Sequence, residues 1–388
     1  MNRIIANRRC LNYILIFGLL IAVLFVGLNN QVLAEDNVNA NSEVDKQVAE
    51  NKQEDKKDEV YIQDRIKALA ITYGSTREKG ILASIKRFFV GSKPLVEFNK
   101  PFGVAVDEST GKIYVTDAVK NEIMVFKADG TYLEKIGVER LKNPTGIDII
   151  NDKIYVSNST KHKITVFDTK GKYIKDFGHI EDEEDFRRLK RPTGLAIDEK
   201  RKLVYVADTK GHNLQVYNLE GELLEVMGMR GSGSGYLNYP IAVAVDQKGQ
   251  IYVGDTLNYR IQVLNPDGKV VRQIDGGPDQ KLGSLPRAKG IAIDNQGRTY
   301  VTDGYLQVVQ IFDQEGKLLS FFGRPGMNDK QFRLPAEIEI DNEGKIYIVD
   351  TMNRRLQVLK LKPPKKEKDK SKQDKMTEQN KKSNNKGK

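Results

Sequence analysis

Hydrophobic and polar positions alternate in short runs along most of the chain, and one five-residue pattern recurs six times. It consists of an aliphatic residue or Thr, then Tyr, then Val or Ile, then any residue, then Asp or Asn. Steps of 41, 50, 47, 48 and 47 residues separate the copies, which end at Asp117, Asn158, Asp208, Asp255, Asp303 and Asp350. A period of about 40 to 50 residues is typical of solenoids and propellers, and short alternating runs favour strands over helices.

Each unit predicts four strands. The first follows a turn that contains Pro and Gly, as in residues 101–107 and 192–198, although the fifth unit has Ala288 in place of the proline. The repeated pattern is the second strand, and a third follows a short polar turn. Glycines such as Gly130 and Gly171 mark the hairpin to a fourth strand, because glycine permits the positive φ that such turns need. Six units of four antiparallel strands predict an all-β, six-bladed β-propeller.

The turns after the second strands resemble the NHL repeat. The matching segments are residues 208–216, with the sequence DTKGHNLQV, and residues 255–263, with the sequence DTLNYRIQV. The resemblance covers roughly residues 100–360 and implies a six-bladed propeller of NHL type. NHL proteins include ligand-binding modules, RNA-binding modules and a zinc lyase, so the resemblance implies no single function.

The sixth unit lacks a fourth strand, because Pro363 and Pro364 follow its third. We expect an upstream strand to complete that blade, either at residues 65–73 or, alternatively, at residues 84–90. With the first choice, apolar residues at helical spacing predict a short amphipathic helix over residues 80–90. Either pairing seals the ring and removes its free sheet edges, which favours a monomeric propeller. We therefore divide this part of the chain into a closure segment, residues 61–98, and the propeller, residues 99–362.

The N-terminal residues 1–34 predict a signal peptide or a signal anchor. Three arginines precede an uncharged apolar run at residues 11–28, and Val32, Leu33 and Ala34 provide a cleavage site after Ala34. The run of 18 residues is also long enough to span a bilayer if it is not cleaved. Both alternatives export the propeller to the periplasm or the cell surface, and the second anchors it to the membrane.

Composition separates the remaining segments. Residues 35–60 are polar and free of aromatic side chains, which predicts a disordered spacer before the propeller. Residues 362–388 hold eleven lysines against four acids, so residues 363–388 predict a disordered lysine-rich tail. The tail accounts for most of the formal net charge of +10. We interpret it as a solvated end that aids solubility, and the alternative is attraction to anionic envelope polymer or lipid. Cys10 is the single cysteine, which excludes a disulfide or a thiolate metal site in the propeller.

Two of the three histidines belong to the repeat. His162 follows Asn158 by four residues and His212 follows Asp208 by four, a position that other units fill with Asn121 or Tyr259. We interpret both as turn residues, and the alternative is that they are zinc ligands. No catalytic motif is present, and we expect no cofactor, with calcium or zinc as the alternative.

Three acids depart from the repeat and are candidate ligand-binding residues. Asp148 and Glu339 stand where other inner strands have a small residue such as Ala105, and Glu337 replaces the turn glycine. If inner strands line an axial channel, these carboxylates face water there and bind a cation or a basic ligand group. The alternative is that neighbouring backbone amides satisfy them.

Two loops that depart from the repeat predict a recognition surface. Residues 181–191 form a charged insertion with Phe186, Arg187 and Arg188, and a Gly-Ser run precedes Tyr236 and Tyr239. Such loops carry variable chemistry on a rigid ring. An ordinary solvated loop is the alternative for the insertion.

The sequence favours an exported binding or scaffold module that recognises a protein or a cell-envelope polymer through these loops. A metal-assisted lyase or hydrolase with its site at the mouth of the channel is the alternative. We expect no nucleic acid partner, because of the export signal and because no continuous basic stripe is interleaved with aromatic residues.

Overall fold

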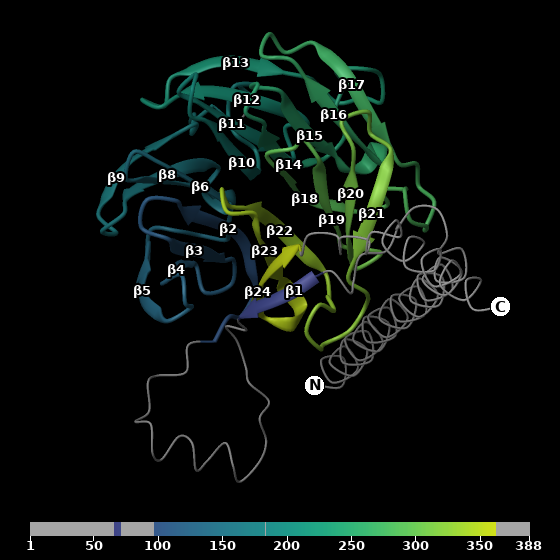
Figure 1. Cartoon of the computed structure of the whole chain (residues 1–388). Helices are drawn as coiled ribbons and strands as arrows, with labels where there is room; N and C mark the ends of the chain where they lie inside the picture. The colour runs from purple at the N-terminus through teal and green to yellow at the C-terminus, as the bar shows by residue number, and fades with distance from the viewer. Residues whose placement is uncertain (1–65, 71–96, 183, 362–388) are drawn as a thin grey trace, which may run out of the picture.

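Six four-stranded antiparallel sheets form a ring in the computed structural model of the chain (Figure 1). The structure describes residues 66–70, 97–182 and 184–361. In each sheet the first strand lies nearest the ring axis and the fourth lies at the periphery. The six-bladed all-β propeller predicted from the repeat is confirmed.

The strands occur in the predicted order in every blade. The inner strands are β2 (Pro101–Asp107), β6 (Pro144–Ile150), β10 (Pro192–Asp198), β14 (Pro240–Val245), β18 (Ala288–Ile293) and β22 (Pro335–Ile340). The second strands are β3 (Lys112–Asp117), β7 (Lys153–Asn158), β11 (Leu203–Asp208), β15 (Ile251–Asp255), β19 (Thr299–Asp303) and β23 (Lys345–Asp350).

The outer half of each blade consists of the third and fourth strands. The third strands are β4 (Glu122–Phe126), β8 (Lys163–Asp168), β12 (Asn213–Asn218), β16 (Arg260–Leu264), β20 (Val308–Phe312) and β24 (Arg355–Leu361). The fourth are β5 (Tyr132–Ile136), β9 (Tyr173–Phe177), β13 (Leu223–Met227), β17 (Val270–Asp275), β21 (Leu318–Phe322) and, for the sixth blade, β1 (Ile66–Ala70).

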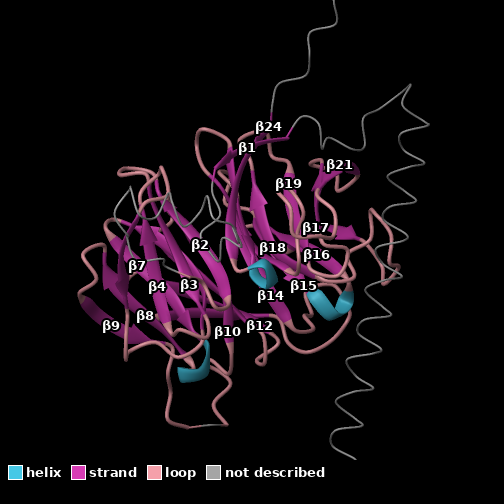
Figure 2. Cartoon of the chain, turned by 90° about the horizontal axis from the view of Figure 1, so that it is seen from below, coloured by secondary structure: helices cyan, strands magenta, loops and turns pink. Residues whose placement is uncertain are grey.

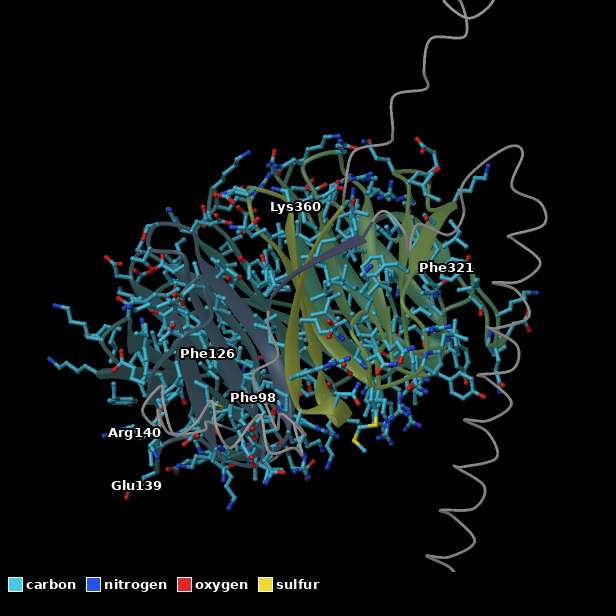
Figure 3. The ribbon with its side chains drawn as sticks, turned by 60° about the horizontal axis from the view of Figure 1, so that its bottom comes forward. Phe98, Phe126, Glu139, Arg140, Phe321 and Lys360 are labelled. Atoms are coloured by element: carbon cyan, nitrogen blue, oxygen red, sulfur yellow. The ribbon has the colours of Figure 1, made fainter. Side chains whose placement is uncertain are left out.

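The hydrophobic core lies between adjacent blades. Second and third strands such as β15 and β16 are buried along their whole length, because neighbouring blades cover both faces of each sheet. One such layer joins Tyr205 and Val216 of the third blade to Val243 and Val253 of the fourth. In the first blade, Phe98 and Phe126 lie with ring centroids 5.7 Å apart (Figure 3).

The repeated acid fastens each blade to the loop that leads into it. The five aspartates and Asn158, which takes the same place in the second blade, are fully buried. Asp117 accepts a hydrogen bond from the amide of Asn99 at 2.6 Å, and Asp208 accepts from the amides of Lys190 and Arg191 at 2.7 and 2.6 Å. The recurrence of Asp or Asn is therefore explained by buried backbone amides that need an acceptor.

Hydroxyl groups join each blade to the next. Thr209 follows the repeated acid of the third blade, and its Oγ1 donates to the carbonyl of Pro240 at 2.7 Å. The same bond closes the ring, where Thr351 Oγ1 donates to the carbonyl of Pro101 at 2.9 Å. Each bond fixes the start of the neighbouring inner strand.

The first and fifth blades have no hydroxyl at that position, where Ala118 and Gly304 stand. The residue just before the acid supplies it instead. Thr116 Oγ1 donates to the carbonyl of Thr145 at 2.7 Å, and Thr302 makes the equivalent bond to the sixth blade. Every blade thus donates a side-chain hydroxyl to its neighbour.

Ring closure occurs at the first of the two sites considered. Strand β1 pairs antiparallel with β24, with Ile66 opposite Leu361 and Ala68 opposite Leu359. A closure strand within residues 65–73 is therefore confirmed. The expected helix at residues 80–90, the spacer, the tail and the apolar run at residues 11–28 lie outside the described residues. Among the residues with a described structure, no helix is long and apolar enough to cross a membrane.

We predict that Asp303→Ala lowers the free energy of unfolding by about 3 kcal/mol, because it leaves buried amides without an acceptor. Asp303 accepts from the amides of Arg287, Tyr305 and Leu306 at 3.2, 2.8 and 2.9 Å. Urea unfolding followed by circular dichroism measures the change. Exposed Glu315, changed to Ala, is the control. Equal stability of the two variants would contradict the role of the acid.

Candidate functional site

The loops at one end of the ring form a continuous surface, which we call the loop face. It consists of the loops that join each fourth strand to the next inner strand, together with the turns between second and third strands. The repeated acids hold these two sets of segments together. Three of the turns are short 3-10 segments, drawn in cyan in Figure 2: η2 (Ser159–Lys161), η3 (Thr256–Asn258) and η4 (Thr351–Asn353).

His162 and His212 lie in these turns as left-handed residues. Their φ angles are 55° and 56°, and Asn121, Tyr259 and Arg354 have similar values at the same position. His162 Nδ1 lies 2.7 Å from the carbonyl of Lys190, and His212 Nδ1 accepts from the amide of Tyr239 at 3.3 Å. The geometry gives both histidines a turn-stabilising role.

The described residues contain no group of three or more His, Cys, Asp or Glu side chains placed to hold a metal ion. His162 and His212 belong to different blades, and each ring contacts a loop backbone atom instead of the other histidine. The zinc alternative for the two histidines therefore gains no support from the described residues.

The acids that depart from the repeat lie on inner strands, as the alignment of the repeats predicts. Asp148 is on β6, and Glu337 and Glu339 are on β22. We call these three residues the axial acids. All three keep partial exposure, while the electrostatic influence of Asp148 reaches both glutamates. They therefore form one electrostatic group near the ring axis.

Glu337 occupies a position where the ring normally requires glycine. A Cβ on Gly194 would lie 2.5 Å from the carbonyl of Ile241, and one on Gly290 would lie 2.6 Å from the carbonyl of Ala336. Glycine is therefore needed wherever successive inner strands approach this closely. Glu337 faces the junction between the sixth and first blades, where the two inner strands have the smallest contact of any neighbouring pair.

Asp148 reaches the inner strand of the next blade. Its Oδ1 accepts from the amide of Ile149 at 2.7 Å, and its Oδ2 accepts from the amide of Ile197 at 2.8 Å. Backbone amides thus satisfy this carboxylate. Burial nevertheless raises the pKa of Asp148 to about 7, against the lowering effect of the two amides.

The two glutamates are more strongly perturbed. Burial raises the pKa of Glu337 to about 8, and the charge of Asp148 adds to the effect. Burial, together with Asp148 and Glu337, raises the pKa of Glu339 well above its usual value. Burial therefore favours the protonated form of the two glutamates, in which a carboxyl group can donate as well as accept a hydrogen bond.

The charged insertion has one anchored residue and an exposed tip. Leu189 is fully buried, while Phe186 is 67% exposed. Arg187 forms an ion pair with Asp185 at 2.6 Å, and the amide of Arg188 donates to the carbonyl of Asp185 at 3.0 Å. Of these residues, the structure leaves Phe186 most available to a partner.

The two tyrosines predicted to contribute to recognition both lie on the loop face. Tyr236 is 44% exposed, and its carbonyl accepts from Arg260 Nη2 at 3.1 Å. Tyr239 is 37% exposed and its ring meets that of His212 edge to face, with centroids 4.6 Å apart. Glu139 and Arg140 project from another loop of the same face (Figure 3).

Sequence reasoning missed several exposed apolar side chains on the loop face. Met229, Leu257, Met327 and Met352 are each about half exposed or more. The signal was present, because leucine and methionine are unusual in polar turns. The repeat alignment hid it, since these residues stand at positions that vary between blades.

Comparison with known proteins supports the fold. Residues 140–230 match the family described as a 6-bladed beta-propeller, and residues 237–264 match the NHL repeat. Among curated proteins, none matches the sequence significantly.

Solved structures share the architecture at low sequence identity. A streptogramin B lyase is 13% identical with a TM-score of 0.52, over 69% of this chain and 95% of that one. A gluconolactonase from Xanthomonas campestris is 18% identical with a TM-score of 0.52, over 68% and 87%. A protein of unknown function from Bacteroides thetaiotaomicron is 15% identical with a TM-score of 0.55, over 76% and 75%. These likenesses establish the fold alone.

We predict that Glu339→Gln raises the melting temperature at pH 8 by about 4 °C or more and leaves it unchanged at pH 4. The folded protein keeps a proton on Glu339 that the unfolded chain releases above its ordinary pKa of 4.5. This group's contribution to stability is therefore complete below that pH and declines as the pH rises toward the folded pKa. Glutamine keeps the neutral shape and does not titrate.

Melting curves at pH 4, 6 and 8 test this difference, with Glu315→Gln as the exposed control. A variant whose stability changes with pH as the wild type does would show that Glu339 is not held protonated.

Proposed function

We propose that this six-bladed β-propeller of NHL type is an extracytoplasmic binding module that presents its loop face to a protein or a cell-envelope polymer. One observation carries the proposal, which is the distribution of exposed apolar side chains. Four of them occupy the same place in the outer strands, namely Ile174, Leu224, Val271 and Leu319. The other nine described ones all lie on the loop face: Val119, Val138, Phe186, Met229, Tyr236, Tyr239, Leu257, Met327 and Met352.

These nine residues, the apolar rim, have the composition of a recognition surface. Tyr, Phe and Met are enriched at protein interfaces, and apolar side chains gathered on one face mark interaction sites. Met229, Tyr236 and Leu257 belong to adjoining segments, because the amide of Leu257 donates to the carbonyl of Asn238 at 3.0 Å. The rim is thus supported by fixed backbone contacts.

The ring holds the loop face in one arrangement before any ligand binds. Each loop is attached to its blade through a buried acid, and each blade to the next through a hydroxyl. A preorganised surface loses less entropy on binding than a mobile one. The architecture therefore suits recognition of a ligand by a rigid surface.

The alternative is a metal-assisted lyase or hydrolase. The similar lyase and lactonase structures support the propeller fold and do not extend their chemistry to this chain at 13% and 18% identity. Burial favours the protonated form of Glu337 and Glu339, and Asp148 is already bonded to two amides. No observation on the described residues favours this alternative over binding.

We predict that a loop-face variant, Met229→Ser with Tyr236→Ser and Leu257→Ser, reduces retention of cell-envelope material by immobilised protein at least about tenfold, or about 1.4 kcal/mol. The matched control changes three outer-strand residues, Leu224, Val271 and Leu319, to Ser. Retention by the control should equal that of the wild type. Equal losses in both variants, or no retention by the wild type, would refute the assignment of the face.

Export has an independent test. A fusion of residues 1–60 to alkaline phosphatase, which is active only outside the cytoplasm, should be active in bacterial cells. Changing Leu19 and Leu20 to Arg should abolish activity, because charge in the apolar run opposes insertion. Activity that persists in the variant would contradict an export role for this segment.

A further inference from the structure

Basic residues recur at the axial edge of the loop face in alternate blades. The residue just before the inner strand is Lys100 in the first blade, Arg191 in the third and Arg287 in the fifth. In the second, fourth and sixth blades it is Asn143, Tyr239 and Leu334, each with a left-handed φ near 53°. The three basic side chains are therefore distributed around the ring axis.

Lys289 adds a fourth cation beside this ring of three. It is the second residue of β18, a position that holds Phe102, Thr145 or Ala336 in other blades. A Cβ built on Gly304 would lie 3.2 Å from Lys289 Cγ, so the lysine stem passes over that glycine. Lys289 is partly buried, whereas Lys100, Arg191 and Arg287 are exposed.

The three basic residues that precede the inner strands are close enough to act on Lys289. Burial, and then the charges of Arg287, Arg191 and Lys100, lower the pKa of Lys289 to about 8, and Asp303 partly opposes them. Asp303 is already occupied by backbone amides. Within the described part of the chain, none of the four cationic side chains has a hydrogen-bond or ion-pair partner.

We propose that Lys100, Arg191, Arg287 and Lys289 form a binding site for one small oxyanion group, a carboxylate or a phosphate, at the axis of the loop face. Guanidinium groups bind such oxyanions through paired N–H donors, and an ammonium group adds a point charge. A bound oxyanion supplies the partner that the four side chains lack. This proposal rests on the proposed function only in taking the loop face as the surface that meets a ligand.

The order of charges along the inner strands favours a single oxyanion group bound at the loop-face end of the axis. Lys289 is at the second position of its strand, Glu337 is at the third, and Asp148 and Glu339 are at the fifth. An anion moving inward from the loop face meets cations first and carboxyl groups next. Between the basic residues stand Asn143, Tyr239 and Leu334, so the charge forms a ring around the axis, unlike the continuous track that a nucleic acid strand requires.

Titration calorimetry of the full chain with inorganic phosphate and with citrate, at pH 7 and low ionic strength, tests the site. Lys289→Met and Arg191→Met should each weaken binding at least tenfold. Lys248→Met is the control, because Lys248 is an exposed cation in the turn at the opposite end of an inner strand. Absence of binding by the wild type, or unchanged affinity in Lys289→Met, would overturn the proposal.

Lys289→Met is expected to fold, since its lowered pKa shows that the buried charge disfavours the folded state at neutral pH. Its melting temperature should equal or exceed that of the wild type. Citrate affinity of the wild type should fall above about pH 8 as Lys289 loses its proton. Arg287 and Arg191 stay charged through this range, while Lys100 and Asp303 are the other charged groups around Lys289. A wild-type profile identical to that of Lys289→Met would contradict a role for this lysine.

Two further measurements identify the source of the anionic group. If citrate competes with retained envelope material and Arg191→Met reduces retention, the anionic group belongs to an envelope ligand. If Arg191→Met loses citrate binding but retains envelope material as the wild type does, the site takes a free anion. Both outcomes support the site. Because citrate titration needs no envelope ligand, failure of retention alone counts against the proposed function and not against the anion site. If single-stranded RNA binds more tightly than citrate, the ligand is a nucleic acid and the proposal of a small oxyanion is wrong.

Discussion

A buried Asp at the end of each second strand, or Asn158 in the second blade, accepts hydrogen bonds from the backbone of the loop that leads into the same blade. Asp208, for example, binds the amides of Lys190 and Arg191 at 2.7 and 2.6 Å. These amides are out of reach of the sheet ladders, so the carboxylate is their acceptor. The bond fixes where the inner strand begins and, with it, the position of the loop face. Both the ring and the candidate sites depend on this interaction.

Contacts between blades place a second constraint on the sequence. Successive inner strands approach so closely that Gly194 and Gly290 have no room for a side chain. Hydroxyls from one blade donate to carbonyls of the next. Where Ala118 or Gly304 replaces the usual Ser or Thr, a threonine two positions earlier makes this hydrogen bond. Glu337 occupies the corresponding glycine position at the junction where the ring closes. The inner strands have less contact with each other at this junction than at the others, and the fourth blade has the small Ala242 at the same position.

The repeat left two candidate sites for the closure strand but was sufficient to predict the blades and the strands that carry the axial acids. Each of these follows from hydrophobic alternation and from residues that recur in register. The apolar rim and the four cations were not predicted, because they stand at positions where the blades differ. The sequence did not decide whether backbone amides bind the carboxylate of Asp148, since Ile197, which donates one of the two hydrogen bonds, belongs to the next blade. Contacts between units are invisible to an alignment of the units with one another.

Most blades have no charged side chain near the ring axis, although Asp148 also accepts from an amide of the next blade. Other blades fill the position of Lys289 with Phe, Thr, Ile or Ala and the position of Asp148 and Glu339 with Ala. Burial shifts the pKa of each of these charged groups toward its neutral form, so each opposes folding in the pH range where it would otherwise be charged. A ring fastened by buried acids and hydroxyls can tolerate that cost. Because the residues at equivalent positions avoid this cost, these charges agree with our proposal that a ligand meets the axis of the loop face.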